Sequence, residues 1–486
     1  MAKNRIAHDD ATGITMKGQS PTIREWRDLL RLALPLAAAQ AGTQLMGIVD
    51  MAVVGRLGAR ELGSVGLGNA MFFAVTVVGI GIVMGIDPLI AQALGAGNRL
   101  LARHTLWQGV WIALTVSVVL STVLFFSPLL LQAISIAPAI VHDASSYLLI
   151  RTLSLFPFLL FFVLRSYLQA NGITRPMLVS MIVANVLNFA GAVVLVFGGS
   201  VLPHWTGPLR LIPAYGVTGS AVATLFSTIV QTLIVLAAVR NTSVAGFTSS
   251  MRRLVRTEYE RAMRIGLPLG MQMGAEVGIF ALVALLAGRL GQQQLAAHQL
   301  TISLASFTFT VALGIGAAGS VRVGRAIGAR DAAGTRRAGL VAIAAGAGIM
   351  SLFGLAFWLF PGPLASILSD VPEVLAASIP LLAVAAVFQI SDGVQAVAAG
   401  VLRGAADTRF AFVANVCGHW LIGFPVALFL GFHLKMGILG LWWGLCAGLT
   451  AVAILLLLRF LRLSSRPIEP VAGRAEPMAI ATAAEG

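Results

Sequence analysis

The chain alternates long apolar segments with short polar connections along almost its whole length. A helix needs about 20 residues to cross the hydrocarbon core of a bilayer, and twelve apolar segments meet that length. They are centred in 29–54, 62–86, 101–127, 146–168, 177–198, 214–239, 263–287, 295–320, 337–360, 376–401, 410–432 and 437–461. This pattern predicts an all-helical polytopic membrane protein with twelve transmembrane helices.

Short motifs of the first two spans recur 233 positions later, with no insertion or deletion between them. Leu34-Pro35 recurs as Leu267-Pro268, Gly55-Arg-Leu-Gly58 as Gly288-Arg-Leu-Gly291, and Gly95-Ala96 as Gly328-Ala329. One constant offset over this length indicates an internal duplication, which is typical of transporters whose substrate and ion sites lie in or between two related lobes.

The duplication divides the chain into two six-helix lobes with pseudo-symmetry. We expect a cytoplasmic amino-terminal tail, an N-lobe, a cytoplasmic inter-lobe loop, a C-lobe and a disordered cytoplasmic carboxy-terminal tail. Their boundaries are, in the same order, 1–28, 29–239, 240–262, 263–462 and 463–486. The connection 199–213 contains three prolines and is expected to be an irregular periplasmic loop.

Composition excludes a soluble protein. The chain is 58% hydrophobic and 11% charged, whereas a soluble domain carries about 25% charged residues. The net charge of +14 follows from topology: 27 of the 33 Lys and Arg residues lie in the tails and the even-numbered connections. Basic residues favour the cytoplasmic side of a membrane, so both termini are predicted to lie in the cytoplasm. The chain itself is predicted to lie in the inner membrane. The lipid bilayer is therefore the expected partner, and nucleic acid is not.

Three carboxylates fall well inside predicted spans: Asp50, Glu276 and Asp392. An ionised carboxylate at the bilayer centre costs roughly 2.5–3.5 kcal/mol on insertion scales. No Lys or Arg is predicted to lie deep in any span, so a proton or a bound cation is the expected partner rather than a salt bridge. Burial raises the pKa of a carboxyl and a nearby cation lowers it, so such groups can exchange protons for cationic cargo.

Several polar side chains accompany these carboxylates. Gln272 lies one turn before Glu276 and Gln389 lies one turn before Asp392, while Asn185 and Asn188 share one side of another span. Buried amides in lipid can also serve only to tie helices together, and this alternative stays open for both asparagines. Asp87, at the cytoplasmic end of its span, is predicted to be structural or to take part in gating.

The sequence does not support an enzyme. Gly-x-Ser-x-Gly, His-Glu-x-x-His and Gly-x-x-x-x-Gly-Lys-Ser/Thr are absent. The string 314–319 fits the dinucleotide fingerprint, but no strand precedes it. Cys417 and Cys446 have no partners at metal-ligand spacing. We therefore predict a secondary transporter without a cofactor, in which Na+ or H+ is the coupling ion.

The motifs resemble those of multidrug and toxic compound extrusion (MATE) antiporters. The first lobe carries the resemblance through Leu34-Pro35, Val49-Asp50, Gly55-Arg-Leu-Gly58 and Gly95-Ala-Gly-Asn98. The second lobe carries it through Gly266-Leu-Pro-Leu-Gly270, Glu276, Val321-Arg-Val-Gly324, Gln389-Ile-Ser-Asp392, Val401-Leu-Arg-Gly404 and Asp407-Thr408. The last three stretches are similar to the bacterial NorM-type branch, and the match runs from about residue 29 to 462.

The resemblance implies two lobes around a V-shaped central cavity and export of cationic, often aromatic drugs against inward Na+ or H+. It also implies that Asp50 is the N-lobe coupling carboxylate, and that Glu276 and Asp392 form a C-lobe cation site that can take Na+.

The resemblance further implies neighbours of these carboxylates and two departures from the family pattern. Asn188 and Thr224 match polar neighbours of the N-lobe site. Ala192 stands where some members carry a second polar residue, and Phe309 stands where some relatives carry tyrosine near the C-lobe site. A ring at this position can still make a cation–π contact. These departures leave the coupling ion undecided.

Two other functions remain compatible with the sequence. A lipid-linked precursor flippase of related architecture is one, although basic cavity residues would be expected for a phosphate headgroup. A channel or receptor is the other, and the two-half duplication with midplane acids argues against it. Because duplication supplies two-fold symmetry within one chain, we expect the protein to function as a monomer.

Overall fold

Every regular element in the described parts of the chain, residues 21–129 and 138–471 of a computed structural model, is helical. The amino-terminal half contains α1 (Pro21–Val54), α2 (Ala59–Val83), η1 (Met84–Ile86), α3 (Asp87–Gly95), α4 (Arg99–Phe125), α6 (Pro138–Leu153), α7 (Leu155–Ala170), α8 (Arg175–Phe197), η2 (Gly199–Val201), η3 (His204–Leu211) and α9 (Gly216–Arg240).

The carboxy-terminal half begins after a connection that includes the short helix η4 (Ser250–Arg252). It contains α10 (Arg256–Arg289), α11 (Gln292–Gly328), α12 (Ala332–Leu359), α13 (Pro361–Ser366), α14 (Pro372–Gly404), α15 (Thr408–Val416), η5 (Cys417–Gly423), α16 (Phe424–Leu428), η6 (Phe429–His433) and α17 (Gly437–Leu463).

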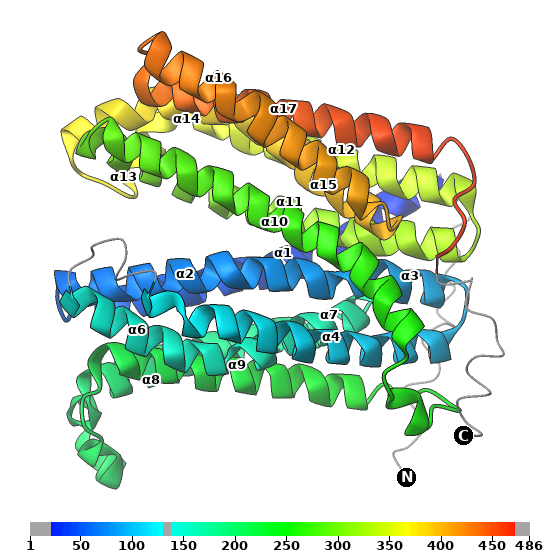
Figure 1. Cartoon of the computed structure of the whole chain (residues 1–486), viewed down its shortest axis with the longest axis horizontal. Coiled ribbons are helices and arrows are strands. Elements are labelled where there is room, and N and C mark those ends of the chain that lie inside the picture. Colours follow the sequence, from blue (N-terminus) through cyan, green and yellow to red (C-terminus); the bar gives the residue numbers. More distant parts are fainter. Residues whose placement is uncertain (1–20, 130–137, 472–486) are drawn as a thin grey trace.

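The predicted span count is confirmed. Eleven helices of the described chain are long and apolar enough to cross a membrane, and α6 with α7 forms a twelfth span that is bent by 44°. The helices gather in two bundles that lie one above the other in Figure 1. We call α1–α9 the N-lobe and α10–α17 the C-lobe. Both ends of the described chain lie at the same end of the molecule, which we call the terminal end.

The helices are longer than the apolar segments predicted. The first helix begins at Pro21 rather than near residue 29, so 21–28 belong to the bundle. The connection between the lobes shortens to 241–255 because α10 begins at Arg256. Residues 464–471, placed in the disordered tail by the sequence, follow the protein surface, where the Val471 N–H donates to Gln92 Oε1 at 2.8 Å. The remaining tail residues, 1–20 and 472–486, lie outside the described chain.

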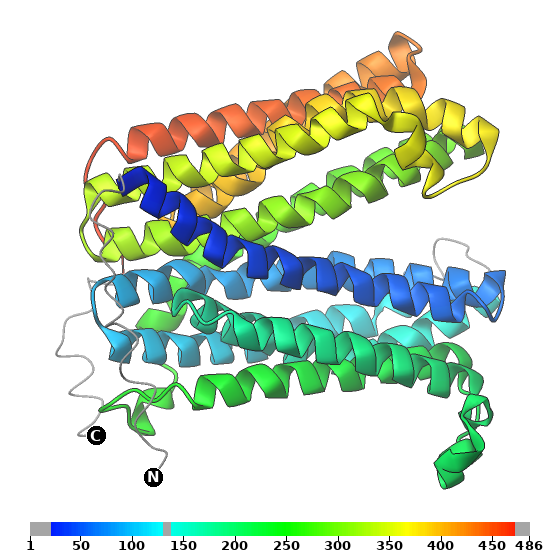
Figure 2. The same ribbon diagram turned by 180° about the vertical axis from the view of Figure 1, so that it is seen from behind.

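Two helices cross from one lobe to the other. The first part of α1 packs its Leu29 and Leu36 side chains into the C-lobe core, whereas its Val53 and Val54 pack against α8 and α9 of the N-lobe. Helix α10 does the reverse, with Ala262 in an N-lobe core and its later residues in the C-lobe. Both crossings are visible as diagonal helices, α10 in Figure 1 and α1 in Figure 2.

The lobes touch backbone to backbone near the terminal end, and the contacts obey the sequence repeat. A Cβ on Gly95 would lie 2.1 Å from the carbonyl oxygen of Arg325, and a Cβ on Gly328 would lie 2.0 Å from that of Gln92. These two contacts exchange under the 233-residue offset. Glycine is required because any side chain would separate the helices. The interface therefore has pseudo-two-fold symmetry within one chain.

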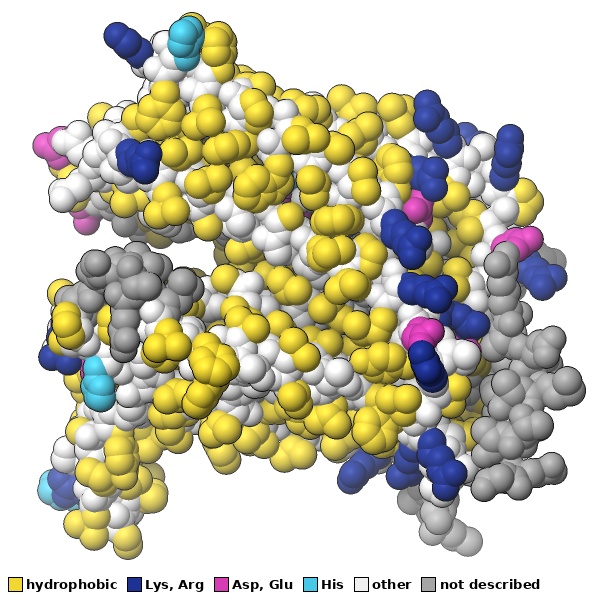
Figure 3. Space-filling model, in the orientation of Figure 1, with side chains coloured by type: hydrophobic (Ala, Val, Ile, Leu, Met, Phe, Trp, Pro, Cys, Tyr) yellow, Lys and Arg dark blue, Asp and Glu magenta, His cyan; other side chains and the backbone are white. Residues whose placement is uncertain are grey.

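The opposite end of the molecule is open. Figure 3 shows the surface hollowed between the two lobes at that end, whereas the lobes meet at the terminal end, where Lys and Arg side chains also gather. We call this the open end. The arrangement agrees with the V-shaped cavity that was predicted, in a state closed at the terminal end.

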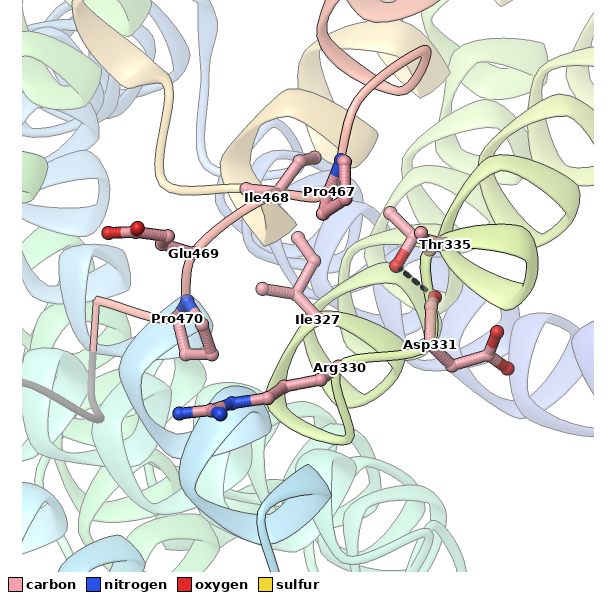
Figure 4. A pocket seen from close by; sticks show the side chains of 9 residues that line it. Ile327, Arg330, Asp331, Thr335, Pro467, Ile468, Glu469 and Pro470 are labelled. Carbon is pink, nitrogen blue, oxygen red and sulfur yellow. Dashed lines mark hydrogen bonds between the residues drawn. The ribbon is translucent and has the colours of Figure 1, made fainter.

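Two surface pockets lie at the terminal end, away from the three carboxylates. One, of about 390 Å³, is lined by Ile327, Arg330, Asp331, Thr335 and the segment 467–470 (Figure 4). Another, of about 470 Å³, is lined by residues of α1, α3, α11 and α12. Neither is lined by Asp50, Glu276 or Asp392, so neither is the predicted ion site.

Candidate ion and substrate site

The N-lobe site is a short hydrogen-bonded chain around Asp50. The Thr224 hydroxyl lies 2.8 Å from Asp50 Oδ2, and Asn188 Nδ2 donates to that hydroxyl at 3.0 Å. All three side chains are buried, and they come from α1, α9 and α8. The structure thus brings together three of the residues predicted from the sequence.

A buried arginine stands near this site, contrary to our prediction that no basic residue lies deep in a span. Arg151 is only 9% exposed and lies close enough to act electrostatically on Asp50. Its guanidinium carbon lies 4.2 Å from the centre of the Phe72 ring. The prediction failed because the span was placed at 146–168, which put Arg151 at its edge. The span instead begins at Pro138, since α6 and α7 form one bent pair.

The C-lobe site is built around Glu276 on α10. Asn415 Nδ2 donates to Glu276 Oε2 at 3.2 Å, and Gln395 Nε2 donates to the same oxygen at 3.4 Å. Asp392, one turn before Gln395 on α14, lies close enough to interact electrostatically with Glu276. The structure therefore places both predicted C-lobe carboxylates in one site.

The donors at this site leave acceptor oxygens free. Gln395 Oε1 and Asn415 Oδ1 are buried and have no hydrogen-bond partner in the described chain. Two carboxylates and two amide carbonyls supply hard oxygen ligands, which is the donor type that alkali and alkaline-earth cations prefer. No group of three His, Cys, Asp or Glu residues suited to a metal occurs among the described residues, so the donor set differs from that of a structural metal site.

The other residues predicted to lie near the carboxylates make contacts that differ from one residue to the next. Asn185 Nδ2 donates to the carbonyls of Gly42 and Met181 at 3.0 and 2.9 Å, so it ties α8 to α1. Gln389 is buried and donates to the Thr308 hydroxyl at 2.5 Å, with no hydrogen bond to Asp392.

Gln272 and Phe309 also lack a direct bond to the carboxylates. Gln272 is buried, and its Oε1 has no hydrogen-bond partner in the described chain. Phe309 packs against Ala312, Met350 and Ala396. The structure therefore brings neither side chain into hydrogen-bond contact with Glu276 or Asp392.

Sequence reasoning missed Gln395 and Asn415. Gln395 carried a usable signal, because it continues the helical stripe of Gln389 and Asp392 on the same face of α14. Asn415 carried none, because it lies 139 positions from Glu276 and no local pattern relates the two.

The family model for MatE matches two segments of the chain, residues 35–194 and 268–429. Their starts are separated by the same 233 residues as the repeat. The chain belongs to the MatE family. It is 33% identical over 449 residues to the probable multidrug resistance protein NorM of Rhizobium meliloti, covering 91% of this chain and 94% of that protein. It is 35% identical over 451 residues to the protein of the same name from Mesorhizobium japonicum, covering 90% and 94%.

The architecture is also that of solved MATE structures. The crystal structure of MATE in the bent conformation superimposes with a TM-score of 0.81 over 92% of this chain and 98% of that chain, at 19% identity. This likeness confirms the fold of a membrane transporter. The two relatives are named multidrug resistance proteins, and a solved structure of the same fold is named a eukaryotic MATE transporter.

A second cluster of buried charges lies where the two lobes of this MatE-family chain meet. Arg403 Nε on α14 lies 3.5 Å from Asp87 Oδ2 on α3, and Arg165 on α7 acts electrostatically on the same carboxylate. Arg165 Nη1 also donates to Gln40 Oε1 at 2.6 Å. Two uncharged bonds join the lobes nearby: Gln92 Nε2 donates to the carbonyl of Gly404 at 3.2 Å, and Gln169 Nε2 to that of Ala317 at 3.1 Å.

We expect Arg403→Gln to weaken closure of the terminal end. The substitution leaves the buried Asp87 with Arg165 as its remaining basic neighbour, and close charge pairs across an interface have coupling energies from roughly 1.5 kcal/mol upward. The fraction open at the terminal end should therefore rise about 10- to 100-fold. The measurement is the distance distribution between nitroxides at Arg99→Cys and Ala332→Cys, after replacement of both native cysteines by alanine.

Asp87→Asn added to Arg403→Gln should not restore the closed population, because the buried Arg165 then loses the carboxylate that acts on it. The matched control is Arg459→Gln, which breaks the Arg459–Asp407 ion pair (Nε to Oδ2, 2.6 Å) within the C-lobe. It should leave the distances unchanged. An Arg403→Gln distribution identical to wild type would show that the pair does not hold the lobes together.

Proposed function

We propose that this chain is a secondary active multidrug exporter that antiports cationic, often aromatic compounds out of the cell against inward Na+ or H+. Relatives at 33 and 35% identity over nine-tenths of the chain are named probable multidrug resistance proteins, which supports the substrate class. The membrane-embedded acids support a cationic cargo and a cationic coupling ion, because both neutralise charge that is costly in lipid.

The observation that carries the proposal is the contrast between the two sites. Asp50 lies near the buried Arg151, so its charge has a fixed counter-charge in the N-lobe. Glu276 acts electrostatically on Asp392, and among the described residues no basic group acts on either carboxylate. Two neighbouring carboxylates require a cation or a proton, and the free amide oxygens beside them supply further ligands. We therefore assign ion coupling to the C-lobe.

The substrate side of the transport cycle is then assigned to three N-lobe residues, Asp50, Asn188 and Thr224. Antiport requires only that ion and drug oppose one another in affinity for the two conformations. In the proposed cycle the ion enters from the open end, neutralises Glu276 and Asp392, and releases the drug there. Drug that loads from the terminal end favours the ion-free carboxylates. The terminal end is assigned to the cytoplasm because basic side chains gather there.

The proposal extends to location and assembly. We propose that the protein lies in the inner membrane with both termini in the cytoplasm. It is proposed to act as a monomer, because its pseudo-two-fold interface is complete within one chain. A lipid-linked precursor flippase is the second candidate function. The observation in its favour is Arg151, since a buried guanidinium can bind a phosphate headgroup by donating hydrogen bonds to it.

The test is efflux of a cationic dye from proteoliposomes under an imposed Na+ gradient or an imposed pH gradient. Antiport predicts faster efflux under one of the two gradients and passive leak when neither is present. Protein-free liposomes under the same gradients are the control. If neither gradient moves any cationic dye, the multidrug assignment fails, and binding of a polyprenyl phosphate should be measured instead.

A further inference from the structure

The connection between α8 and α9 forms a hairpin that projects from the bundle. Helices η2 and η3 pack against each other, and the Gly199 N–H donates to the carbonyl of Ile212 at 2.7 Å to close the base of the hairpin. Figures 1 and 2 both show the hairpin beyond the ends of α8 and α9, extending sideways past the outermost helices rather than over the hollow between the lobes.

The hairpin exposes large apolar side chains. Trp205 is 85% exposed and Leu211 is 83% exposed, and Leu209 and Val201 are about half exposed. A soluble loop of this size would normally cover such groups or replace them with polar ones. Trp is enriched at membrane–water interfaces because its ring is amphipathic. The apolar surface of the hairpin is therefore suited to an interface rather than to water.

The charge of the hairpin is one-sided. Residues 199–215 contain Arg210 and His204 and no Asp or Glu. The Arg210 guanidinium contacts Nδ1 of His204, so the two lie together. Figure 3 shows cationic and histidine side chains at the far edge of the hairpin and apolar side chains over the rest of it. A cation above an apolar surface matches the phosphate layer above the acyl chains.

The lipid-facing surface of the N-lobe continues into the hairpin. Helices α8 and α9 expose apolar side chains along their length, including Ile182, Phe189, Phe226 and Leu233. The hairpin leaves the bundle at the open ends of these helices and extends beyond them on the side away from the C-lobe. A segment at that level and beyond the outermost helices meets the surface of the bilayer.

We propose that the hairpin 199–215 is a membrane-surface anchor that inserts Trp205, Leu209 and Leu211 into the headgroup layer of the outer leaflet. Arg210 and His204 lie at the phosphates. The anchor holds the outer ends of α8 and α9, which carry Asn188 and Thr224, while the lobes move. Its assignment to the outer leaflet rests on the orientation given under Proposed function.

The test is the depth of nitroxide labels in proteoliposomes of bacterial phospholipid. Trp205→Cys and Leu211→Cys are labelled separately after Cys417→Ala and Cys446→Ala, and collision rates with O2 and with a water-soluble nickel chelate are compared. Phe226→Cys on α9 supplies the lipid reference, and Gln293→Cys, in the exposed polar start of α11, supplies the water reference. We expect O2-to-nickel ratios at both hairpin positions at least about threefold above the water reference.

Ratios equal to those of Gln293→Cys would overturn the proposal, because the hairpin would then lie in water. Weak collisions with both reagents, together with dipolar broadening, would also overturn it and would indicate contact with a second copy. The readout does not depend on transport, so failure of the dye assay leaves it interpretable. Labelling of Gln293→Cys by an impermeant maleimide on intact cells tests the orientation separately.

Discussion

Replacing Glu276 by glutamine is expected to reduce ion-driven dye efflux to the passive leak, a fall of about 100-fold. Ion–drug coupling is typically about 1–3 kcal/mol. The amide keeps the size of the side chain and an acceptor for Asn415 and Gln395, but it cannot take up a proton and carries no charge to balance a bound cation. The fold should persist, because removal of the charge also removes its desolvation cost. The measurement is the initial rate of dye efflux under the gradient that drives wild type.

Two comparisons make this result specific to coupling. Glu260→Gln, on the same helix but half-exposed near the terminal end, should retain wild-type rates because the ion pair of Glu260 in the described chain is with Arg256 on the surface. Dye binding to Glu276→Gln, measured without a gradient, should change by no more than a few fold. If Glu276→Gln transports normally while Asp50→Asn is inactive under a pH gradient, the coupling is protonic and lies in the N-lobe.

A single methyl group at Gly266 is expected to reduce transport by about 10- to 100-fold. A Cβ at this position would lie 2.1 Å from the carbonyl oxygen of Ile82 on α2, so the terminal end cannot close without separation of two backbones. Overpacking typically costs about 1–3 kcal/mol, which corresponds to that range of rates if closure is required in every cycle. Gly266→Ala should shift the nitroxide distances between positions 99 and 332 to longer values.

Gly278→Ala is the matched control, because it adds the same methyl group to the same helix. Its Cβ would meet Trp420 at 3.5 Å, an ordinary contact, so the rate should stay within about twofold of wild type. Both substitutions raise helix propensity by about 1 kcal/mol, which excludes loss of α10 as the cause. Normal transport by Gly266→Ala would show that closure at this contact is not needed.

The sequence identified the carboxylates of the candidate sites more reliably than it identified their hydrogen-bond partners. Asp50, Glu276 and Asp392 could be singled out because a carboxylate in a long apolar segment is costly wherever the segment packs. The hydrogen-bond partners of Glu276 could not be found in the same way. Gln395 and Asn415 lie 119 and 139 positions away, and polar residues at such distances meet only through packing. Arg151 was misjudged because a bent span has no single apolar window.

The sequence by itself determined the all-helical class, the twelve spans, the two-fold repeat and the presence of three carboxylates inside spans. These follow from hydropathy and a constant offset, which are properties of the chain read locally. The tertiary structure alone decided that α1 and α10 cross between the lobes, that the terminal end is closed by backbone contacts, and that Arg151 stands near Asp50. Lipid does not distinguish one apolar face of a helix from another. Hydropathy therefore specifies that the helices span the membrane but not which of their faces meet. Close packing of small residues and pairing of buried polar groups then select which faces meet.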